Sequence, residues 1–146
     1  LEEVHPARLL ANSVNVVGSQ AMAKNIRVSV IADPALTLQA DAGKLQQVLL
    51  NLLQNAIDAM EAGGEIKCIA CERNGDMMLS IADNGPGIPE EEQAKIFNLY
   101  YTTKSTGTGL GLSIVHHIIS EHDGDISVTS EKGHGTTFRI LLPTTR

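Results

Sequence analysis

The chain has few of the residues that mark several common protein classes. Its 146 residues include no Trp, two Phe, two Tyr and two Cys. No apolar run approaches the roughly 20 residues that a membrane-spanning helix needs, and no signal-peptide pattern opens the chain. The sequence therefore predicts one domain over residues 1–146, with no direct membrane contact. Because Leu1 is not an initiator Met, we expect this domain to be part of a longer protein.

Positive charge is also scarce. Eleven Lys and Arg face seventeen Asp and Glu, which gives a net charge of −6. Nucleic-acid binding usually requires a basic patch, so we expect no nucleic-acid partner. A nucleotide ligand remains compatible with this charge, because backbone N–H groups, a helix N-terminus and a metal ion can together hold phosphates.

The two cysteines, Cys68 and Cys71, form a C-x-x-C pattern that is typical of zinc and redox sites. The surrounding E-I-K-C-I-A-C-E is predicted to be a strand, in which residues three apart point to opposite faces. No second cysteine pair completes a site. We therefore expect both thiols to be structural, in a reducing cytoplasm.

Hydrophobic periodicity predicts three helices, at residues 2–24, 42–62 and 108–123. Pro6 fits the first turn of the first helix, Gly63-Gly64 is expected to end the second, and Gly124 the third. A connection at residues 85–107, with a short helical piece at 90–97, is long enough to form a lid.

Alternating patterns predict strands around residues 28–30, 36–38, 126–128 and 138–142. Two more, at 65–73 and 76–83, flank Asn74-Gly75, the strongest short-range signal for a hairpin. The predicted fold is an α/β (α+β) two-layer sandwich, in which a mixed, mostly antiparallel sheet packs on three helices.

The second predicted helix carries a narrow polar stripe that is rich in amides. At 3.6 residues per turn its members fall within roughly 100° of arc, and they are Lys44, Gln47, Asn51, Gln54, Asn55 and Asp58. Asn51 and Asn55 are one turn apart and so are neighbours. An Asn offers a carbonyl oxygen to Mg²⁺ and an N–H₂ group to a phosphate. The alternative is an ordinary solvent-facing stripe.

Two polar residues share the alternation of buried neighbours. Asp83 has the parity of Leu79 and Ile81, and Thr136 has the parity of Phe138. A buried carboxylate needs a donor, and an adenine amino group would supply one. The alternatives are that Asp83 caps the next turn of D-N-G-P-G-I, and that Thr136 is a plain edge-strand residue.

A glycine-rich turn precedes the third helix. G-T-G-L-G-L, starting at Gly107, offers free N–H groups and a positive helix end to phosphate. It is neither the dinucleotide fingerprint nor the G-x-x-x-x-G-K-[ST] loop. Lys104 stands just before it and is either a phosphate ligand or a solvated lysine.

Five motifs stand in one order: N-L-L-Q-N-A-I-D-A, D-N-G-P-G-I, I-F-N-L-Y-Y-T-T-K, G-T-G-L-G-L and G-H-G-T-T-F. Over residues 5–143 the chain closely resembles the catalytic, ATP-binding domain of bacterial two-component sensor histidine kinases. The T-T-K form resembles the nitrogen-regulation branch. The resemblance implies a Bergerat-type sandwich that binds ATP and Mg²⁺.

The resemblance also implies roles for individual residues. Asn55 would bind the metal, and Asn51, Asn55 and Lys104 would act in catalysis. The implied nucleotide-binding set is Asn51, Asn55, Asp58, Asp83, Gly85, Gly87, Ile88, Thr102, Thr103, Lys104, Gly107, Thr108, Gly109, Leu110, Gly111, Leu112 and Thr136. Members of the superfamily that hydrolyse ATP carry a Glu where this chain has Asn51, so no water-activating base is evident.

The same resemblance implies partners outside the chain. An upstream dimerisation domain would carry the phosphoaccepting histidine, a response regulator would receive the phosphoryl group, and a dimer is expected only in the intact kinase. None of the five histidines, His5, His116, His117, His122 and His134, has the acceptor's sequence context, so we expect all to be structural or exposed. The alternatives are a serine kinase of the anti-sigma type, a gyrase-like ATPase and a non-catalytic nucleotide-binding or docking module.

Overall fold

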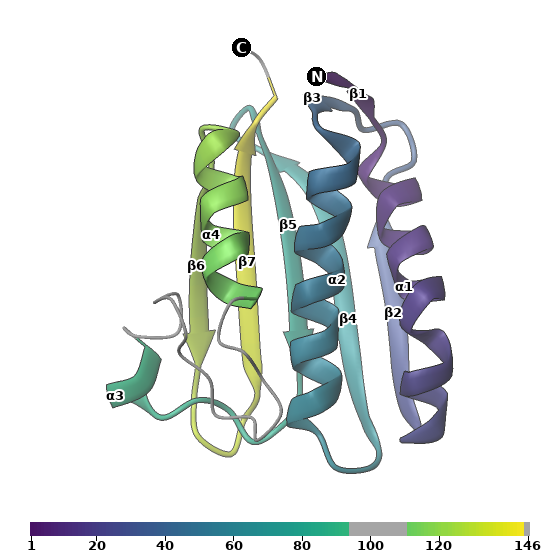
Figure 1. Cartoon of the computed structure of the whole chain (residues 1–146), viewed down its shortest axis with the longest axis vertical. Helices are drawn as coiled ribbons and strands as arrows, with labels where there is room; N and C mark the ends of the chain where they lie inside the picture. The colour runs from purple at the N-terminus through teal and green to yellow at the C-terminus, as the bar shows by residue number, and fades with distance from the viewer. Residues whose placement is uncertain (94–110, 145–146) are drawn as a thin grey trace.

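The computed structural model describes residues 1–93 and 111–144, and in them three helices cover one face of a five-stranded sheet (Figure 1). The helices are α1 (Pro6–Ala23), α2 (Ala42–Ala59) and α4 (Gly111–Glu121). Across the sheet the strands are β2 (Ile26–Ala32), β4 (Gly64–Arg73), β5 (Asp76–Asp83), β7 (Thr136–Pro143) and β6 (Asp125–Ser130). Only β2 and β4 are parallel. The predicted mixed, mostly antiparallel sandwich is confirmed.

The first predicted helix is wrong at its start. Residues Glu2–Val4 form strand β1, which pairs antiparallel with β3 (Leu38–Ala40) in a separate two-stranded sheet. The helix begins only at Pro6, because proline has no N–H to donate and biases the residue before it towards extended backbone. His5 has φ −102° and ψ 107° accordingly. The strand predicted at 36–38 also begins later, at Leu38, after a turn in which Asp33 accepts from the Ala35 N–H at 2.9 Å.

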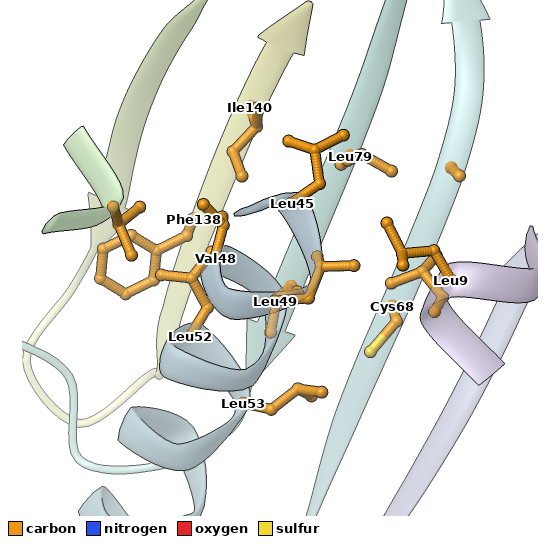
Figure 2. Close-up of a cluster of buried hydrophobic side chains, with 14 of the residues drawn as sticks. Leu9, Leu45, Val48, Leu49, Leu52, Leu53, Cys68, Leu79, Phe138 and Ile140 are labelled. Atoms are coloured by element: carbon orange, nitrogen blue, oxygen red, sulfur yellow. The ribbon is translucent and has the colours of Figure 1, made fainter. Parts of the chain in front are cut away.

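Helix α2 lies between α1 and α4 and carries much of the core (Figure 1). It ends at Ala59, three residues before its predicted end. The Lys24 ammonium, at the end of α1, donates to the Ile57 and Met60 carbonyl oxygens at 2.9 Å each and so caps this terminus. Figure 2 shows the apolar face of α2 against the sheet, with Leu45, Val48, Leu49, Leu52 and Leu53 facing Cys68, Leu79, Phe138 and Ile140.

The hairpin between β4 and β5 turns where predicted. Asn74 and Gly75 both have positive φ, 53° and 84°, as a type I′ turn requires. Helix α4, in its described part, ends at Glu121 rather than 123. Asp123, with φ 58°, makes the left-handed exit that Gly124 was expected to make. Gly124 instead permits a close approach, since a Cβ there would lie 2.6 Å from the Leu141 carbonyl oxygen.

One end of the sandwich gathers several element termini. The ends of β5, β6 and α2 and the start of β7 lie together, at the bottom of Figure 1, whereas α4 starts higher up, where Gly111 meets Asn51 near the middle of α2. The short helix α3 (Glu90–Gln93) is also at the bottom, and the rest of the predicted 90–97 piece lies outside the described residues. No helix in the described part of the chain is long and apolar enough to cross a membrane.

Candidate nucleotide site

Asp83 is the last residue of β5 and faces the helix layer. A Cβ built on Gly85 would lie 3.0 Å from the Asp83 Oδ1 and 3.1 Å from Met60 Cγ, so the carboxyl lies beside the cap of α2. Burial raises the pKa of Asp83, and backbone N–H groups of Gly85 and Thr136 oppose that rise by bonding to the carboxylate. The Gly85 N–H donates at 2.9 Å. Asp83 thus faces inward, as predicted, and also caps the following turn, which was the alternative; its contact with adenine stays a prediction.

Glycines lie near Asp83 at places where the backbone of another segment comes too close for a side chain. Gly87 has φ 80°, and a Cβ there would collide with the Glu131 carbonyl oxygen in the β6–β7 turn. Gly135 has φ 94°, and its Cβ would collide with the Asp83 carbonyl oxygen. The segment after β5 is therefore pressed onto the β6–β7 turn with no room for a side chain between them.

Thr136 lies beside Asp83, because the two residues are directly paired across β5 and β7. It is 7% exposed, and its hydroxyl lies 2.9 Å from the Ser130 Oγ. The predicted inward orientation of Thr136 is confirmed. Ser130 was missed, although the signal was present: it is a polar residue at the parity of Ile126 and Val128, which is the argument that singled out Thr136.

Met60 and Gln93 were also missed as site residues. Met60 is 4% exposed and lies 2.7 Å, at its Sδ, from the place of a Cβ on Gly64. As an apolar residue at the end of the second predicted helix, it gave no hint that it would face the segment after Asp83. Gln93 donates to the Ile88 and Ser130 carbonyl oxygens at 2.9 and 3.0 Å. No sequence period could reveal that contact, because it joins a short helix to a distant strand.

The polar stripe of α2 contacts two different helices, α4 and α1. Asn51 donates from Nδ2 to the Gly111 carbonyl oxygen at 3.4 Å, at the start of α4. Gln54 instead donates to Gln20 of α1 at 2.7 Å and to Asp58 at 2.9 Å. Lys44, at the other end of α2, pairs with Glu121. The stripe is thus not one ligand-facing surface, and Asn51 is the member whose amide meets the start of α4.

The remaining predicted residues fall into two groups. Ile88, Gly111 and Leu112 are half-buried, and Gly111 lies beside Asn51. The others lie outside the described residues, and they are Thr102, Thr103, Lys104, Gly107, Thr108, Gly109 and Leu110.

The cysteines and histidines agree with their predicted structural roles. Cys68 is buried, which raises the pKa of its thiol to about 11, and Cys71 is half-buried. No group of three His, Cys, Asp or Glu suitable for a metal occurs within residues 1–93 and 111–144. His116, His117 and His134 are exposed, whereas His122 is buried between α4 and the start of α2.

Comparison with known proteins gives consistent matches. Residues 40–146 match the family described as histidine kinase-, DNA gyrase B- and HSP90-like ATPase. The sensor histidine kinase ZraS of Escherichia coli K12 is 40% identical over 98% of this chain, which spans 31% of that protein. The catalytic domain of histidine kinase ThkA superposes with a TM-score of 0.90 and 34% identity, over 98% of this chain and 95% of that one. ThkA in complex with response regulator TrrA matches with a TM-score of 0.85 and 32% identity, over 99% and 42%.

The family match and the superposed structures define the class of this sandwich, which is an ATP-binding ATPase domain. The chain belongs to the histidine kinase-, DNA gyrase B- and HSP90-like ATPase family. Within that family it matches the catalytic domains of sensor histidine kinases.

Proposed function

We propose that this chain binds Mg²⁺-ATP between α2, α4 and the β5–β7 end, and that it supplies the γ-phosphoryl group to a histidine on an upstream domain. The observation that carries the proposal is Asp83, a half-buried carboxylate held by two backbone N–H groups beside a glycine wall. Such a group needs a further donor, and the amino group of adenine is one that an ATPase-family domain would meet.

The donor set on α2 fits a magnesium ion. Magnesium takes hard oxygen ligands and keeps coordination places for phosphate and water, so one protein amide oxygen suffices. Asn55 is half-buried one turn beyond Asn51, and Asn51 points its Nδ2 at the Gly111 carbonyl. In this proposal the Asn55 side chain holds the ion, which neutralises charge on the phosphates. Asn51 fixes the start of α4, and the glycine turn before α4 and Lys104 complete the phosphate site.

The proposed reaction is phosphoryl transfer, in which the domain mainly positions the reactants and stabilises charge. The bond between the γ-phosphorus and the β,γ-bridging oxygen breaks, a P–N bond to an imidazole nitrogen forms, ADP leaves and the imidazole loses its proton. This chain's contribution is to hold and orient the nucleotide. Asn51, an amide, cannot serve as a general base for water, which favours transfer over hydrolysis.

The acceptor histidine, the dimer interface and the receiver of the phosphoryl group belong to the proposal too. The chain spans 31% of ZraS, which leaves room for an upstream dimerisation and phosphoacceptor domain. ThkA has a response regulator partner, and we propose the same class of partner here. A cytoplasmic location follows from the use of ATP. Membership of the nitrogen-regulation branch stays a proposal on the T-T-K motif.

The test is calorimetric titration of ATP into the chain, with and without Mg²⁺. We expect binding that Asp83→Ala weakens more than about tenfold, since a hydrogen bond to a charged group contributes about 1.5–3 kcal/mol. Asn55→Ala should remove the dependence on Mg²⁺. Matched controls are Asp125→Ala and Asn15→Ala, exposed residues on β6 and α1. Absence of ATP binding by the wild-type chain would favour the docking module, and steady ATP hydrolysis would favour the gyrase-like alternative.

Transfer itself is tested on the intact protein. With the upstream domain present, labelled ATP should yield acid-labile phosphohistidine, and the chain alone should yield none. Acid-stable phosphoserine on a partner protein, formed by the chain alone, would contradict histidine transfer and support the serine kinase alternative.

A further inference from the structure

Ser130, the last residue of β6, joins three segments through one hydroxyl. Its Oγ accepts from the Ile88 N–H at 2.7 Å. The same oxygen lies 3.0 Å from the Gly135 carbonyl oxygen and 2.9 Å from Thr136 Oγ1. These three partners come from the segment after β5, from the β6–β7 turn and from the start of β7.

Counting protons fixes the direction of each bond. A serine hydroxyl has one hydrogen to donate and two lone pairs to accept with. The Gly135 carbonyl can only accept, so the Ser130 hydrogen goes there, and one lone pair takes the Ile88 N–H. The contact with Thr136 can then be made only if Thr136 donates. Its single hydrogen is used in that bond, and its oxygen keeps only acceptor capacity.

This arrangement places two acceptors side by side. Thr136 and Asp83 are directly opposite in the register of β5 and β7, where the Cβ atoms of paired residues lie about 4.5–5.5 Å apart. The Asp83 carboxylate takes N–H groups from Gly85 and Thr136, and an ionised carboxylate has only acceptors to offer. What lies against the pair must therefore bring donors.

Further hydrogen bonds fix the segments around Ser130. The Gln93 side chain donates to the carbonyl oxygens of both Ile88 and Ser130, so it spans the same junction. The Gly133 N–H donates to the Pro86 carbonyl oxygen at 2.6 Å. Ser130 is thus the centre of a fixed junction between the segment after Asp83 and the β6–β7 turn, and it cannot easily turn its hydroxyl to another partner.

We propose that Ser130 is a positioning residue that makes the Thr136 hydroxyl an acceptor beside Asp83, so that this end of the sheet selects a purine with a 6-amino group over one with a 6-oxo group. The proposal rests on the proposed nucleotide site and deepens it. Adenine donates at position 6, directly or through a water, and two acceptors suit it. Hypoxanthine presents an acceptor at that position, which two further acceptors oppose.

The test compares ATP with inosine triphosphate, which has a 6-oxo group in place of the 6-amino group and a hydrogen on N1, by calorimetry on wild type, Ser130→Ala and Ser130→Thr. In Ser130→Ala the Thr136 hydroxyl is released and can donate to the 6-oxo group. We expect the ratio of ATP to inosine triphosphate affinity to fall about tenfold, the size of one hydrogen bond. Ser130→Thr keeps the hydroxyl and should restore the ratio. Ser127→Ala, an exposed serine on the other face of β6, is the matched control and should leave the ratio unchanged.

A merely structural role has a different outcome. If Ser130→Ala weakens both nucleotides equally and lowers the unfolding temperature, the proposal is overturned, and an unchanged ratio also overturns it. If Ser130→Ala does not fold, Thr136→Val, which removes the acceptor and keeps the shape, must lower the ratio. If wild type does not bind ATP, the proposed nucleotide site itself is wrong. If ATP binding is intact and the variants leave the ratio unchanged, only the proposed role of Ser130 is wrong.

Discussion

The two ends of α2 are both held by neighbouring elements, but by different kinds of contact. At its start, Asp41 accepts from the Lys44 N–H, and its own N–H donates to His122 Nε2 at 3.1 Å. Lys44 and Glu121 form an ion pair at 3.3 Å between side chains that are 50% and 45% exposed. At its end, the Lys24 ammonium caps two carbonyl groups, and Met60 is buried beneath two glycines.

This difference indicates which end of α2 tolerates substitution. The Lys44 and Glu121 side chains meet in water and have room to rearrange, so the start of α2 loses little when this ion pair is removed. At the other end, carbonyl groups and glycines meet at contact distance, and a displaced atom has nowhere to go. Because the proposed nucleotide site lies at this second end, changes there should alter both stability and binding. Changes at the first end should alter stability alone.

The largest expected effect comes from Gly135→Ala. Gly135 has φ 94°, and the new Cβ would collide with the Asp83 carbonyl oxygen. We expect a loss of about 3 kcal/mol or more, because backbone rather than a side chain must move. Urea unfolding measures it. The control is Gly18→Ala in α1, where a Cβ meets nothing within 4 Å and where about 0.5–1 kcal/mol should be gained. Equal effects of the two changes would contradict the comparison.

Lys24→Met should come next. The Met side chain keeps the apolar stem but leaves the Ile57 and Met60 carbonyl groups without their charged donor. We expect a loss of about 1.5–3 kcal/mol, the range for a hydrogen bond to a charged group, and weaker ATP binding because the cap adjoins Gly85. Thermal unfolding and calorimetry together check it. A stability loss with unchanged ATP affinity would separate the cap from the site.

Asp83→Asn should act in opposite directions on stability and binding. Burial raises the pKa of Asp83 in the folded chain above its ordinary value of 3.8, so the folded state holds that proton more tightly than the unfolded state. The associated stability is present in acid and is lost as the pH rises from about 3.8 through the raised pKa. At neutral pH the nucleotide-free Asn variant should therefore be more stable than wild type, by less than the Lys24→Met loss, while ATP binding is lost.

The measurement is unfolding at a series of pH values without nucleotide. The gap between Asp83→Asn and wild type should widen from acid to neutral pH, because only wild type then carries a half-buried charge. Asp125→Asn, at an exposed position, should show no such widening. A gap that does not depend on pH would show that the change acts through packing.

Lys44→Met should have the smallest effect. Its ion pair with Glu121 lies in solvent, so we expect a loss of about 1 kcal/mol or less, and less still at high salt. ATP affinity should not change. A shift in ATP affinity as large as that of Lys24→Met would show that the start of α2 also controls the site, and the comparison between the two ends would fail.

Most of the correct structural predictions depend on patterns within a short stretch of the sequence. The Asn74-Gly75 turn follows from the backbone freedom of those two residues, and the inward orientation of Asp83 and Thr136 from the two-residue period of a strand. The polar stripe shows the limit of such reasoning. The helical period correctly placed Lys44, Asn51 and Gln54 on one side of α2. In the structure, Lys44 and Asn51 contact α4, whereas Gln54 contacts α1.

By itself the sequence determined the family, most of the helices and strands, and the inward orientation of Asp83 and Thr136, because each of these depends on spacing along the chain. Tertiary structure alone decided three other features: strand β1, which exists only through its pairing with β3; the cap that Lys24 gives to α2; and the Ser130 junction. These contacts join residues 33 to 42 positions apart, and no local period encodes a hydrogen bond between groups that only folding brings together.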